Sequence, residues 1–414
     1  MVDSVPSSLQ EPPMSKILYL SRTGMLEPLG LTQVLSYLRG LSRDHTITLI
    51  SFERGGDEEG EARSVGVRQF CREHGIRWVR LQYRNRPRWL AGALNLATLC
   101  AAVFREILRD RPDLIHARSY IPATAAWAVN RLMGLPYVFD MRSLWPEELI
   151  TSGRAKRDTW AYRQIVRMEG RLLRDAAAVV SVTHAAIDWL NKEHPGMLEE
   201  RRVHVIPGSA DLQRFQPAVR TSERPLLFGC HGSITTGWFR LDLLARTFAN
   251  LAKRYPDAKF EIVTTSPPEE VMSAFDGART FSDRLRIFAV TAGDMHEVLR
   301  RHDLSIFFYS SGAASEIGRS PVRMGEALAC GLPVLTNGQI GDVAEIVRKY
   351  NVGVLLEDGS EAGIDDAVSR VLRMVRDPAV SDRCRRAAEE IYSLDVGTAA
   401  YLQVYQQALK SENS

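Results

Sequence analysis

Short apolar runs alternate with longer segments in which apolar residues recur every three or four positions. In the first half of the chain the short runs predict strands at residues 16–20, 46–52, 113–117, 137–140, 178–182 and 203–206. Helical patterns lie between them, at residues 31–41, 121–133 and 158–174. Because near-continuous apolar strands separated by helices are typical of a parallel sheet with both faces covered, this half predicts a doubly wound α/β domain.

The alternation pauses at residues 207–225, where Pro207-Gly208, Pro217 and a polar run predict a linker. A second series of apolar runs then predicts strands at residues 226–230, 259–263, 285–288, 304–308, 333–336 and 352–356. We therefore predict two Rossmann-like, doubly wound domains that face each other across a cleft, since open parallel sheets bind ligands beyond the carboxyl ends of their strands.

Composition narrows the class of protein only modestly. The 53 basic residues nearly balance the 50 acidic ones, so charge does not indicate a nucleic-acid partner. The 5 cysteines are scattered and form no Cys-x-x-Cys pair, so neither a zinc site nor a disulfide framework is expected, and a reducing cytoplasm fits. Residues 1–8 lack the basic start and apolar centre of a signal peptide.

Residues 319–337 hold the clearest chemical pattern. Ser320 is a suitable N-cap, Pro321 suits the first helical position, and Gly331 suits the position after the helix. The segment therefore predicts a short helix followed by a strand, with free N–H groups at the helix start that would make an anion site.

Charged residues accompany that helix start. Arg319 and Arg323 flank it, and Arg323 shares one helix face with Glu326, three positions later. A guanidinium suits a diphosphate, and a carboxylate can accept two hydroxyl hydrogens of a ribose. The alternative is a solvated Arg–Glu pair on an ordinary helix.

Residues 325–336, Gly-Glu-Ala-Leu-Ala-Cys-Gly-Leu-Pro-Val-Leu-Thr, resemble the donor-binding signature of glycosyltransferase family four. Other stretches resemble the same family in the same order, at residues 24–34, 113–118, 139–148, 205–215 and 338–347. Together they extend over residues 15–356. The resemblance implies the GT-B fold, transfer from a nucleotide sugar with retention at the anomeric carbon, and no requirement for a metal ion or another cofactor.

The resemblance also assigns the predicted domains. We expect an N-terminal acceptor domain and a C-terminal nucleotide-sugar donor domain, followed by a last helix that packs back on the first domain. The complete division is a disordered tail at 1–14, the acceptor domain at 15–210, a linker at 211–224, the donor domain at 225–392 and the last helix at 393–414.

The family pattern assigns the donor ribose to Glu326 and, through a sub-group with Ser-Pro-x-Arg before the helix, the donor phosphates to Arg323. The family has a second Glu where this sequence has Gly318. Glu316 is a candidate substitute, with an ordinary loop acid as the alternative. The strand at 226–230 leads to three further donor-binding candidates, which are His231, Gly232 and Ser233.

Relatives also supply an Arg and a Lys shortly after that strand, whereas the next basic residue here is Arg240. We therefore expect part of the phosphate-binding role to lie with Arg319 and Arg323. Ser320 belongs to the same predicted donor site.

A further departure lies at Arg142, where many relatives carry a His. An Arg stays cationic, so it can stabilise charge but cannot act as a general base. The resemblance implies that the departing phosphate oxygen takes the acceptor's proton, so the protein mainly binds and polarises. Asp140, Glu147 and Glu148 are candidates to orient the acceptor hydroxyl, with charges at a helix start as the alternative for Glu147 and Glu148.

The first predicted strand leads to a glycine-containing loop that is neither a dinucleotide fingerprint nor a P-loop. Gly24 is a candidate for the donor phosphates. Glu27, Gln33 and His116 are candidates for the acceptor, with a turn acid and a packed histidine as the alternatives for Glu27 and His116.

Residues 80–109 combine arginines and Trp89 with an apolar run. This pattern suits a helix that lies on a membrane surface, and equally a core helix after a basic loop. The first alternative would place a lipid-linked acceptor at the cytoplasmic face of the membrane.

The sequence therefore predicts a cytoplasmic, retaining, metal-independent hexosyltransferase that uses a UDP- or GDP-linked sugar. Its acceptor would be a hydroxyl of a glycan or lipid-linked molecule in polysaccharide or glycolipid assembly. Two alternatives stay open, which are a GT-B epimerase or phosphorylase and a non-catalytic binding or scaffold protein.

Overall fold

The computed structural model describes residues 14–54, 58–219, 224–235, 237–273, 275, 281–310 and 312–410, with only the backbone for residues 58, 59, 88 and 89. Residues 1–13 of the predicted tail and 220–223 of the predicted linker lie outside the described residues. By their contacts, the described parts of residues 1–138 and 408–414 form one compact unit, and those of 139–407 form the other.

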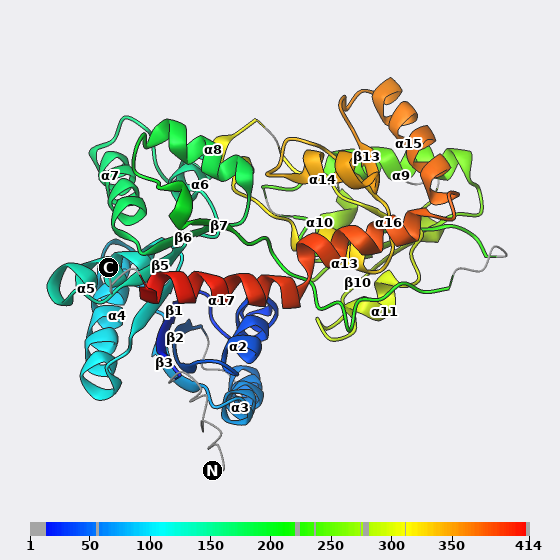
Figure 1. Cartoon of the computed structure of the whole chain (residues 1–414). Coiled ribbons are helices and arrows are strands. Elements are labelled where there is room, and N and C mark those ends of the chain that lie inside the picture. The colour runs from blue at the N-terminus through cyan, green and yellow to red at the C-terminus, as the bar shows by residue number, and fades with distance from the viewer. Residues whose placement is uncertain are drawn as a thin grey trace, which may run out of the picture. The chain divides into compact units, whose positions relative to one another are not determined.

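The strands form two sheets (Figure 1). The first has seven strands in the order β3-β2-β1-β4-β5-β6-β7, and the second has six in the order β10-β9-β8-β11-β12-β13. All recorded pairs between these strands are parallel, for example Leu18 with Thr48 and Phe228 with Phe260. These are the two doubly wound sheets that the alternating pattern predicts, and the predicted fold class is confirmed.

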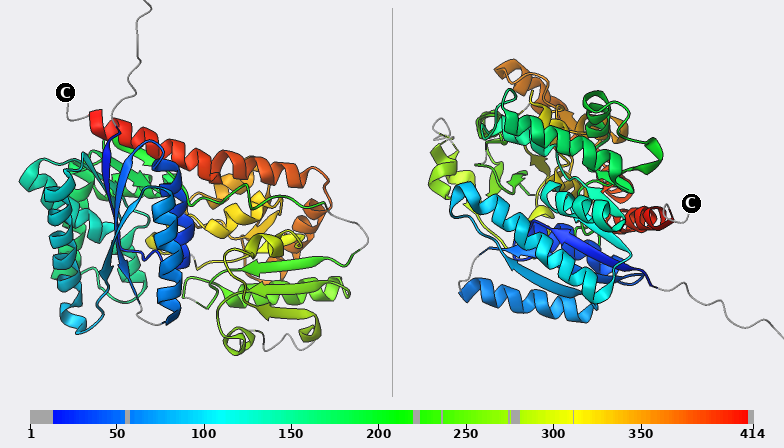
Figure 2. Two further views of the ribbon diagram at one scale, coloured as in Figure 1. Left: turned by 90° about the horizontal axis from the view of Figure 1, so that it is seen from below. Right: turned by 90° about the vertical axis from the view of Figure 1, so that its left-hand side faces the viewer.

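The strands of the first sheet are β1 Lys16–Ser21, β2 Thr46–Glu53, β3 Arg77–Gln82, β4 Leu114–Arg118, β5 Tyr137–Asp140, β6 Ala178–Ser181 and β7 Val203–Val205. Its helical segments are α1 Pro28–Gly30, η1 Leu31–Leu35, α2 Ser36–Leu41, α3 Glu58–Glu73, α4 Arg88–Asp110, α5 Tyr120–Met133, α6 Trp145–Thr151, α7 Trp160–Asp175, α8 His184–Glu193 and η2 Glu200–Arg202. In the first compact unit, α4 and α5 cover one face of the strands and α2 and α3 the other (Figure 2).

The strands of the second sheet are β8 Leu227–His231, β9 Lys259–Val263, β10 Leu285–Phe288, β11 Leu304–Ile306, β12 Val334–Thr336 and β13 Gly353–Leu355. Its helical segments are α9 Leu241–Arg254, α10 Pro268–Ser273, η4 Ser282–Arg284, α11 Met295–Leu299, α12 Ala314–Ile317, α13 Val322–Ala329, α14 Val343–Tyr350, α15 Glu361–Val375, α16 Val380–Ala387 and η5 Ala388–Tyr392. The last helix, α17, spans Leu394–Lys410.

The second sheet is held by an apolar core rich in phenylalanine. The rings of Phe248 and Phe260 have centroids 4.9 Å apart, and Phe281 lies 5.1 Å from Phe260. All three side chains are fully buried. Burial of such large rings is a major source of stability, because each removes an extensive apolar area from water.

Among the described residues, α4 is the one helix whose length and composition would allow it to cross a membrane. Its apolar window, within Leu90–Asp110, is 39% buried inside the structure. Leu99 and Val103 are completely buried, so this helix contributes to the core of its unit. Core helices pass the same test of length and composition, which makes it weak evidence for a membrane span.

Candidate active site

The carboxyl end of β8 leads into a tight loop that holds an arginine. Gly232 has a φ of 96°, which favours glycine. A Cβ at this position would lie 3.0 Å from Nη2 of Arg323, so the arginine packs directly on the glycine. The same nitrogen donates a hydrogen bond of 2.8 Å to the carbonyl oxygen of Ser233. The structure therefore brings Arg323 of α13 against the predicted loop residues.

A buried histidine holds the carboxylate one turn further along α13. Nε2 of His231 lies 3.1 Å from Oε2 of Glu326. The His231 side chain is 2% exposed, whereas that of Glu326 is 18% exposed. Five predicted donor residues, namely His231, Gly232, Ser233, Arg323 and Glu326, thus form one cluster where β8 meets α13.

Arg323 retains an unused donor within this cluster. Its Nη1 is buried and has no hydrogen-bond partner among the described residues. Its guanidinium lies over the rings of Phe239 and Tyr309, at 5.2 and 5.4 Å from their centroids. A buried donor without an acceptor is costly, so this position suits an incoming anionic oxygen.

Arg319 stacks on the aromatic residue next to Phe239. Its guanidinium carbon lies 3.8 Å from the ring centroid of Trp238. The two arginines at the start of α13 therefore rest on consecutive aromatic residues, Trp238 and Phe239, which precede α9. The sequence analysis did not single out this pair, although two adjacent aromatic residues between a strand and a helix could have indicated it.

Glu316 is buried beside Arg319 and is 1% exposed. Its Oε2 lies 3.5 Å from Nε of Arg319, and Ser315 Oγ donates to its Oε1 at 3.3 Å. Burial raises the pKa of the Glu316 carboxyl, and the charge of Arg319 partly offsets this. Glu316 is therefore a buried partner of Arg319.

Gly318 is required by close packing. A Cβ at this position would lie 2.8 Å from the backbone nitrogen of Leu144 and 2.9 Å from its Cγ. Such distances leave no space for a side chain without movement of the Leu144 backbone. The family's second Glu has no room at this position.

The start of α13 differs from the sequence prediction, which made Ser320 the N-cap and Pro321 the first helical residue. Pro321 is the N-cap, with extended dihedrals of φ −69° and ψ 108°, and the helix begins at Val322. The hydroxyl of Ser320 instead accepts a hydrogen bond of 3.2 Å from Gly208 N–H. The predicted stop is confirmed, because Gly331 follows the C-cap with a φ of 70°.

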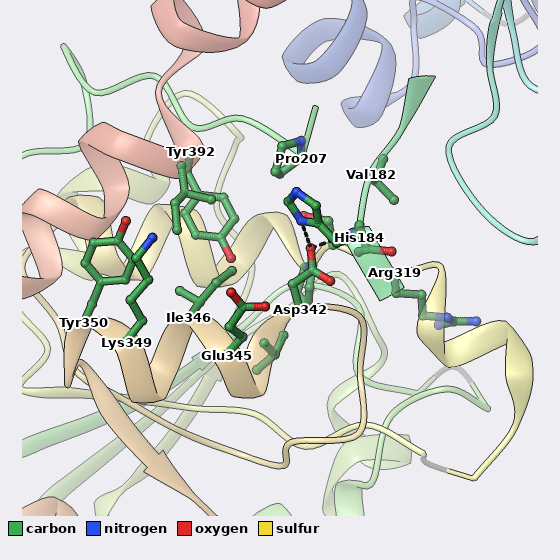
Figure 3. A pocket seen from close by; sticks show the side chains of 15 residues that line it. Val182, His184, Pro207, Arg319, Asp342, Glu345, Ile346, Lys349, Tyr350 and Tyr392 are labelled. Atoms are coloured by element: carbon green, nitrogen blue, oxygen red, sulfur yellow. Dashed lines mark hydrogen bonds and ion pairs between the residues drawn. The ribbon is translucent and has the colours of Figure 1, made fainter. Parts of the chain in front are cut away.

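A pocket of about 150 Å³ opens beside this helix start (Figure 3). Its lining includes Arg319, Ser320 and Pro321 before the helix, together with Asp342 and His184. The remaining lining includes Val182, Thr183, Pro207, Val343, Glu345, Ile346, Lys349, Tyr350, Ile391 and Tyr392. The start of α13, where the predicted anion site lies, is therefore part of a pocket wall.

Asp342 fixes the helix start opposite. Its carboxylate accepts hydrogen bonds from the backbone nitrogens of His184 and Ala185, at 2.8 and 3.0 Å. Nδ1 of His184 lies 3.0 Å from the same carboxylate (Figure 3). Thr183 caps α8 with its hydroxyl and donates to the carbonyl oxygen of Ile317 at 2.8 Å. These bonds connect the start of α8 to the end of α12 and to the start of α14.

Asp140 is the last residue of β5, Arg142 follows two positions later, and both contact the last helix. The hydroxyl of Tyr401 donates to Oδ2 of Asp140 at 3.0 Å and accepts from Nη1 of Arg142 at 3.2 Å. Nη1 of Arg142 also lies 3.6 Å from Oδ1 of Asp140. Arg142 has a φ of 61°, which is uncommon for a non-glycine residue and is found most often at constrained positions. The two candidates thus form one network with Tyr401.

Glu147 is held in a separate buried network. It accepts a hydrogen bond of 2.6 Å from the hydroxyl of Tyr162 and pairs with the guanidinium of Arg157. Its side chain is 2% exposed. The structure gives Glu147 internal partners in the first turn of α6 and does not group it with Arg323 or Glu326.

The remaining candidates belong to the first compact unit. A Cβ at Gly24 would lie 2.8 Å from Oε2 of Glu53, whose carboxylate accepts from the backbone nitrogens of Met25 and Leu26. Glu27 lies 3.6 Å from Arg54 in an exposed ion pair.

Two of these candidates are buried in that unit. Gln33 is 3% exposed in the π-helical turn η1, and His116 is fully buried, with its ring stacked 4.2 Å from that of Tyr19.

The described residues give little support for thiol or metal chemistry near the cluster of Arg323 and Glu326. Burial raises the pKa of the Cys230 thiol to about 11, so this cysteine stays protonated at neutral pH. No group of three or more metal-ligating side chains occurs in the described part of the chain.

Comparison with known proteins identifies the family. A family model described as Glycosyltransferase Family 4 matches residues 32–214, and one described as Glycosyl transferases group 1 matches residues 225–374. The chain belongs to glycosyltransferase family four. The family resemblance found in the sequence is thereby confirmed.

One curated relative and two solved structures illustrate the likeness. A D-inositol 3-phosphate glycosyltransferase of Arthrobacter sp. (strain FB24) is 24% identical over 306 residues, which cover 67% of this chain and 66% of that relative. Sucrose-phosphate synthase from Thermosynechococcus elongatus superposes with a TM-score of 0.73 at 14% identity, covering 96% of this chain and 100% of its own. Anabaena HepE in complex with UDP and glucose gives 0.65 at 14% identity, covering 95% and 99%. This family-four glycosyltransferase therefore has the GT-B fold.

Proposed function

We propose that this glycosyltransferase moves a hexose-type sugar from a UDP- or GDP-linked donor to a hydroxyl of a glycan or lipid-linked acceptor. The proposed setting is polysaccharide or glycolipid assembly at the cytoplasmic side of the membrane. The single observation that carries the proposal is the cluster of Arg323, Glu326 and His231 at the carboxyl end of β8. HepE, a structural neighbour, was solved with UDP and glucose, which favours a nucleotide-sugar donor here.

The nucleoside diphosphate is assigned to two residues of α13. The unused Nη1 of Arg323 would donate to a diphosphate oxygen, which supplies the acceptor that this buried nitrogen lacks. Glu326, oriented by His231 at 3.1 Å, would accept the two hydroxyl hydrogens of the ribose. Trp238 and Phe239 fix the two arginine side chains before the donor binds.

The proposed reaction retains the configuration of the anomeric carbon and uses no metal ion or other cofactor. The bond from the anomeric carbon to the phosphate oxygen breaks, and a bond to the acceptor oxygen forms on the same face. The acceptor's proton passes to the departing phosphate oxygen. The protein then has to stabilise the negative charge on the leaving diphosphate, which Arg323 and Arg319 would do.

Titration calorimetry with UDP, GDP and their sugars tests the proposal and identifies the nucleotide. Glu326→Ala and Arg323→Ala are each expected to weaken binding by about 10- to 100-fold, since a charged hydrogen bond contributes about 1.5–3 kcal/mol. Exposed Glu297→Ala, whose side chain is 63% exposed, is the matched control. Full affinity in both site variants would place the donor elsewhere, and no binding of any nucleotide would favour a scaffold protein.

Product analysis separates transfer from the alternatives in the GT-B fold. We expect a glycosylated acceptor and free nucleoside diphosphate without added inorganic phosphate. Interconversion of free nucleotide sugars without an acceptor would instead indicate an epimerase, and dependence on phosphate a phosphorylase.

A further inference from the structure

Helix α7 carries a ridge of arginines on its outer face. Arg163, Arg167, Arg171 and Arg174 recur at spacings of three or four residues and are all exposed. With Trp160 they fall within roughly 100° of the helix circumference, given 100° per residue. Trp160 begins the helix and is 71% exposed. The face opposite is fixed in the structure, because Tyr162, Leu172 and Leu173 are buried.

The charge of this region exceeds that of the whole chain. Residues 154–175 contain seven basic and three acidic residues, a net charge of +4, whereas the 414 residues together carry +3. One of the three acids, Glu169, lies on the buried face and is 2.8 Å from Nε2 of His194. Another, Asp175, pairs with Arg174 at 2.7 Å. In the described part of the chain no ion pair joins Arg163 or Arg167 to a carboxylate.

Three arginines of residues 80–109, where the sequence suggested a membrane-facing helix, have local partners, whereas Arg84 and Arg86 are exposed. Arg80 donates to Ser64 at 2.8 Å, Arg105 pairs with Glu106 at 3.2 Å, and Arg109 lies 3.8 Å from Asp110. Helix α7, in the second compact unit, differs in presenting four exposed arginines on one helix face, of which Arg163 and Arg167 have no carboxylate partner among the described residues.

We propose that the outer face of α7 docks on a bilayer surface that contains anionic phospholipid. The arginines match the negative headgroups, and an exposed tryptophan at the end of the ridge suits the boundary between headgroups and acyl chains. Nucleic acid would also attract the arginines, and it is an alternative outcome of the test below. The inference is independent of the proposed transfer reaction, since docking is measured without donor or acceptor.

Vesicle co-sedimentation of the full chain tests the proposal. The protein is expected to bind vesicles of phosphatidylcholine with 30% phosphatidylglycerol at 0.1 M NaCl, and not vesicles of phosphatidylcholine alone. The triple variant Arg163→Gln/Arg167→Gln/Arg171→Gln should lose roughly 100-fold in partition coefficient, from about 1 kcal/mol per basic residue. The control is Arg370→Gln/Arg373→Gln/Arg376→Gln on and just after α15, which removes equal charge and should change binding less than twofold.

Trp160 gives a second measurement that charge alone would not affect. Vesicles with brominated acyl chains should quench the fluorescence of the wild type more than that of Trp160→Phe. Equal quenching, or equal loss of binding in both arginine triples, would overturn the proposal. Retained binding to heparin or single-stranded DNA without vesicle binding would also overturn it and assign the ridge to a polyanion. Equal melting temperatures of the variants exclude unfolding as the cause of a loss.

Discussion

Individual residues explain why this chain departs from its family at Gly318. The structure gives the departure a packing cause, because the backbone of Leu144 occupies the space that a side chain would need. Glu316, two positions before Gly318, pairs with Arg319, whose guanidinium stacks on Trp238. A carboxylate is therefore present close to Gly318 in the sequence.

Restoring the family residue should therefore damage the fold. Gly318→Glu is expected to lower the free energy of unfolding by about 1–3 kcal/mol, as overpacked sites do. Urea unfolding measures this change. Gly92→Ala in α4, where an added Cβ meets nothing within 4 Å, is the control and should stabilise slightly. A stable Gly318→Glu variant with raised activity would show that the backbone of Leu144 moves at little cost in stability.

The carboxyl of Glu316 makes a pH-dependent contribution to stability. Its pKa is raised by burial, so the folded state holds the proton more tightly than the unfolded state. The stability that this proton contributes is present at low pH and is lost as the pH rises through the folded pKa.

Glu316→Gln should therefore gain stability relative to the wild type as the pH increases from below 4.5 upward. Urea unfolding of both proteins at a series of pH values gives the difference. If the free energy of unfolding of Glu316→Gln relative to the wild type stays constant or falls as the pH rises, the raised pKa of Glu316 is contradicted.

The sequence singled out residues that the structure brings together where two signals coincided. Arg323 and Glu326 combined helical spacing with a family signature, and the structure groups them with His231, Gly232 and Ser233. Trp238 was missed although it forms an adjacent aromatic pair with Phe239, because residue type does not show that its ring stacks on Arg319. Tyr401 was missed because a contact over 261 positions leaves no local pattern.

At the scale of elements, helix starts depend on partners distant in sequence. Ser320 was a reasonable N-cap by residue type, yet its hydroxyl accepts from Gly208, 112 positions away. Strand β3 was also missed. It carries two arginines, Arg77 and Arg80, and its residues are mostly half-exposed, as an edge strand permits. Its sequence therefore lacks the apolar run by which the other strands were found.

The start of α8 should weaken without Asp342. Asp342→Ala removes a carboxylate that accepts from the backbone nitrogens of His184 and Ala185. The expected loss is about 1–2 kcal/mol, typical of a charged helix-start contact. Hydrogen exchange should become faster in the first turn of α8, while Asp366→Ala on α15 leaves it unchanged. Unaltered exchange in that turn would argue against the assigned role.

At the scale of the whole molecule, the alternation of apolar strands and helices was sufficient to predict two parallel sheets. Their order and register are set by long-range pairing, such as β1 between β2 and β4, which the local pattern does not encode. Net charge likewise does not describe local surfaces, because a total of +3 does not show that residues 154–175 carry a net charge of +4.

Global stability should depend on the hydrogen bond between the last helix and the end of β5. Tyr401→Phe leaves the fully buried carboxylate of Asp140 without this donor, so we expect a loss of about 1.5–3 kcal/mol. Thermal unfolding measures it. Tyr255→Phe, whose hydroxyl accepts from Arg376 at the surface, should change stability by less than about 0.5 kcal/mol. Equal effects of the two changes would refute the network.

The packing of Gly232 against Arg323 also limits how this enzyme can be re-engineered. A side chain at position 232 would need both a left-handed backbone and the space that the guanidinium fills. Substitutions at 232 and 323 should therefore show strong epistasis. A library that randomises only one of the two positions will return the wild-type residue, whereas other solutions are accessible only when both positions vary together.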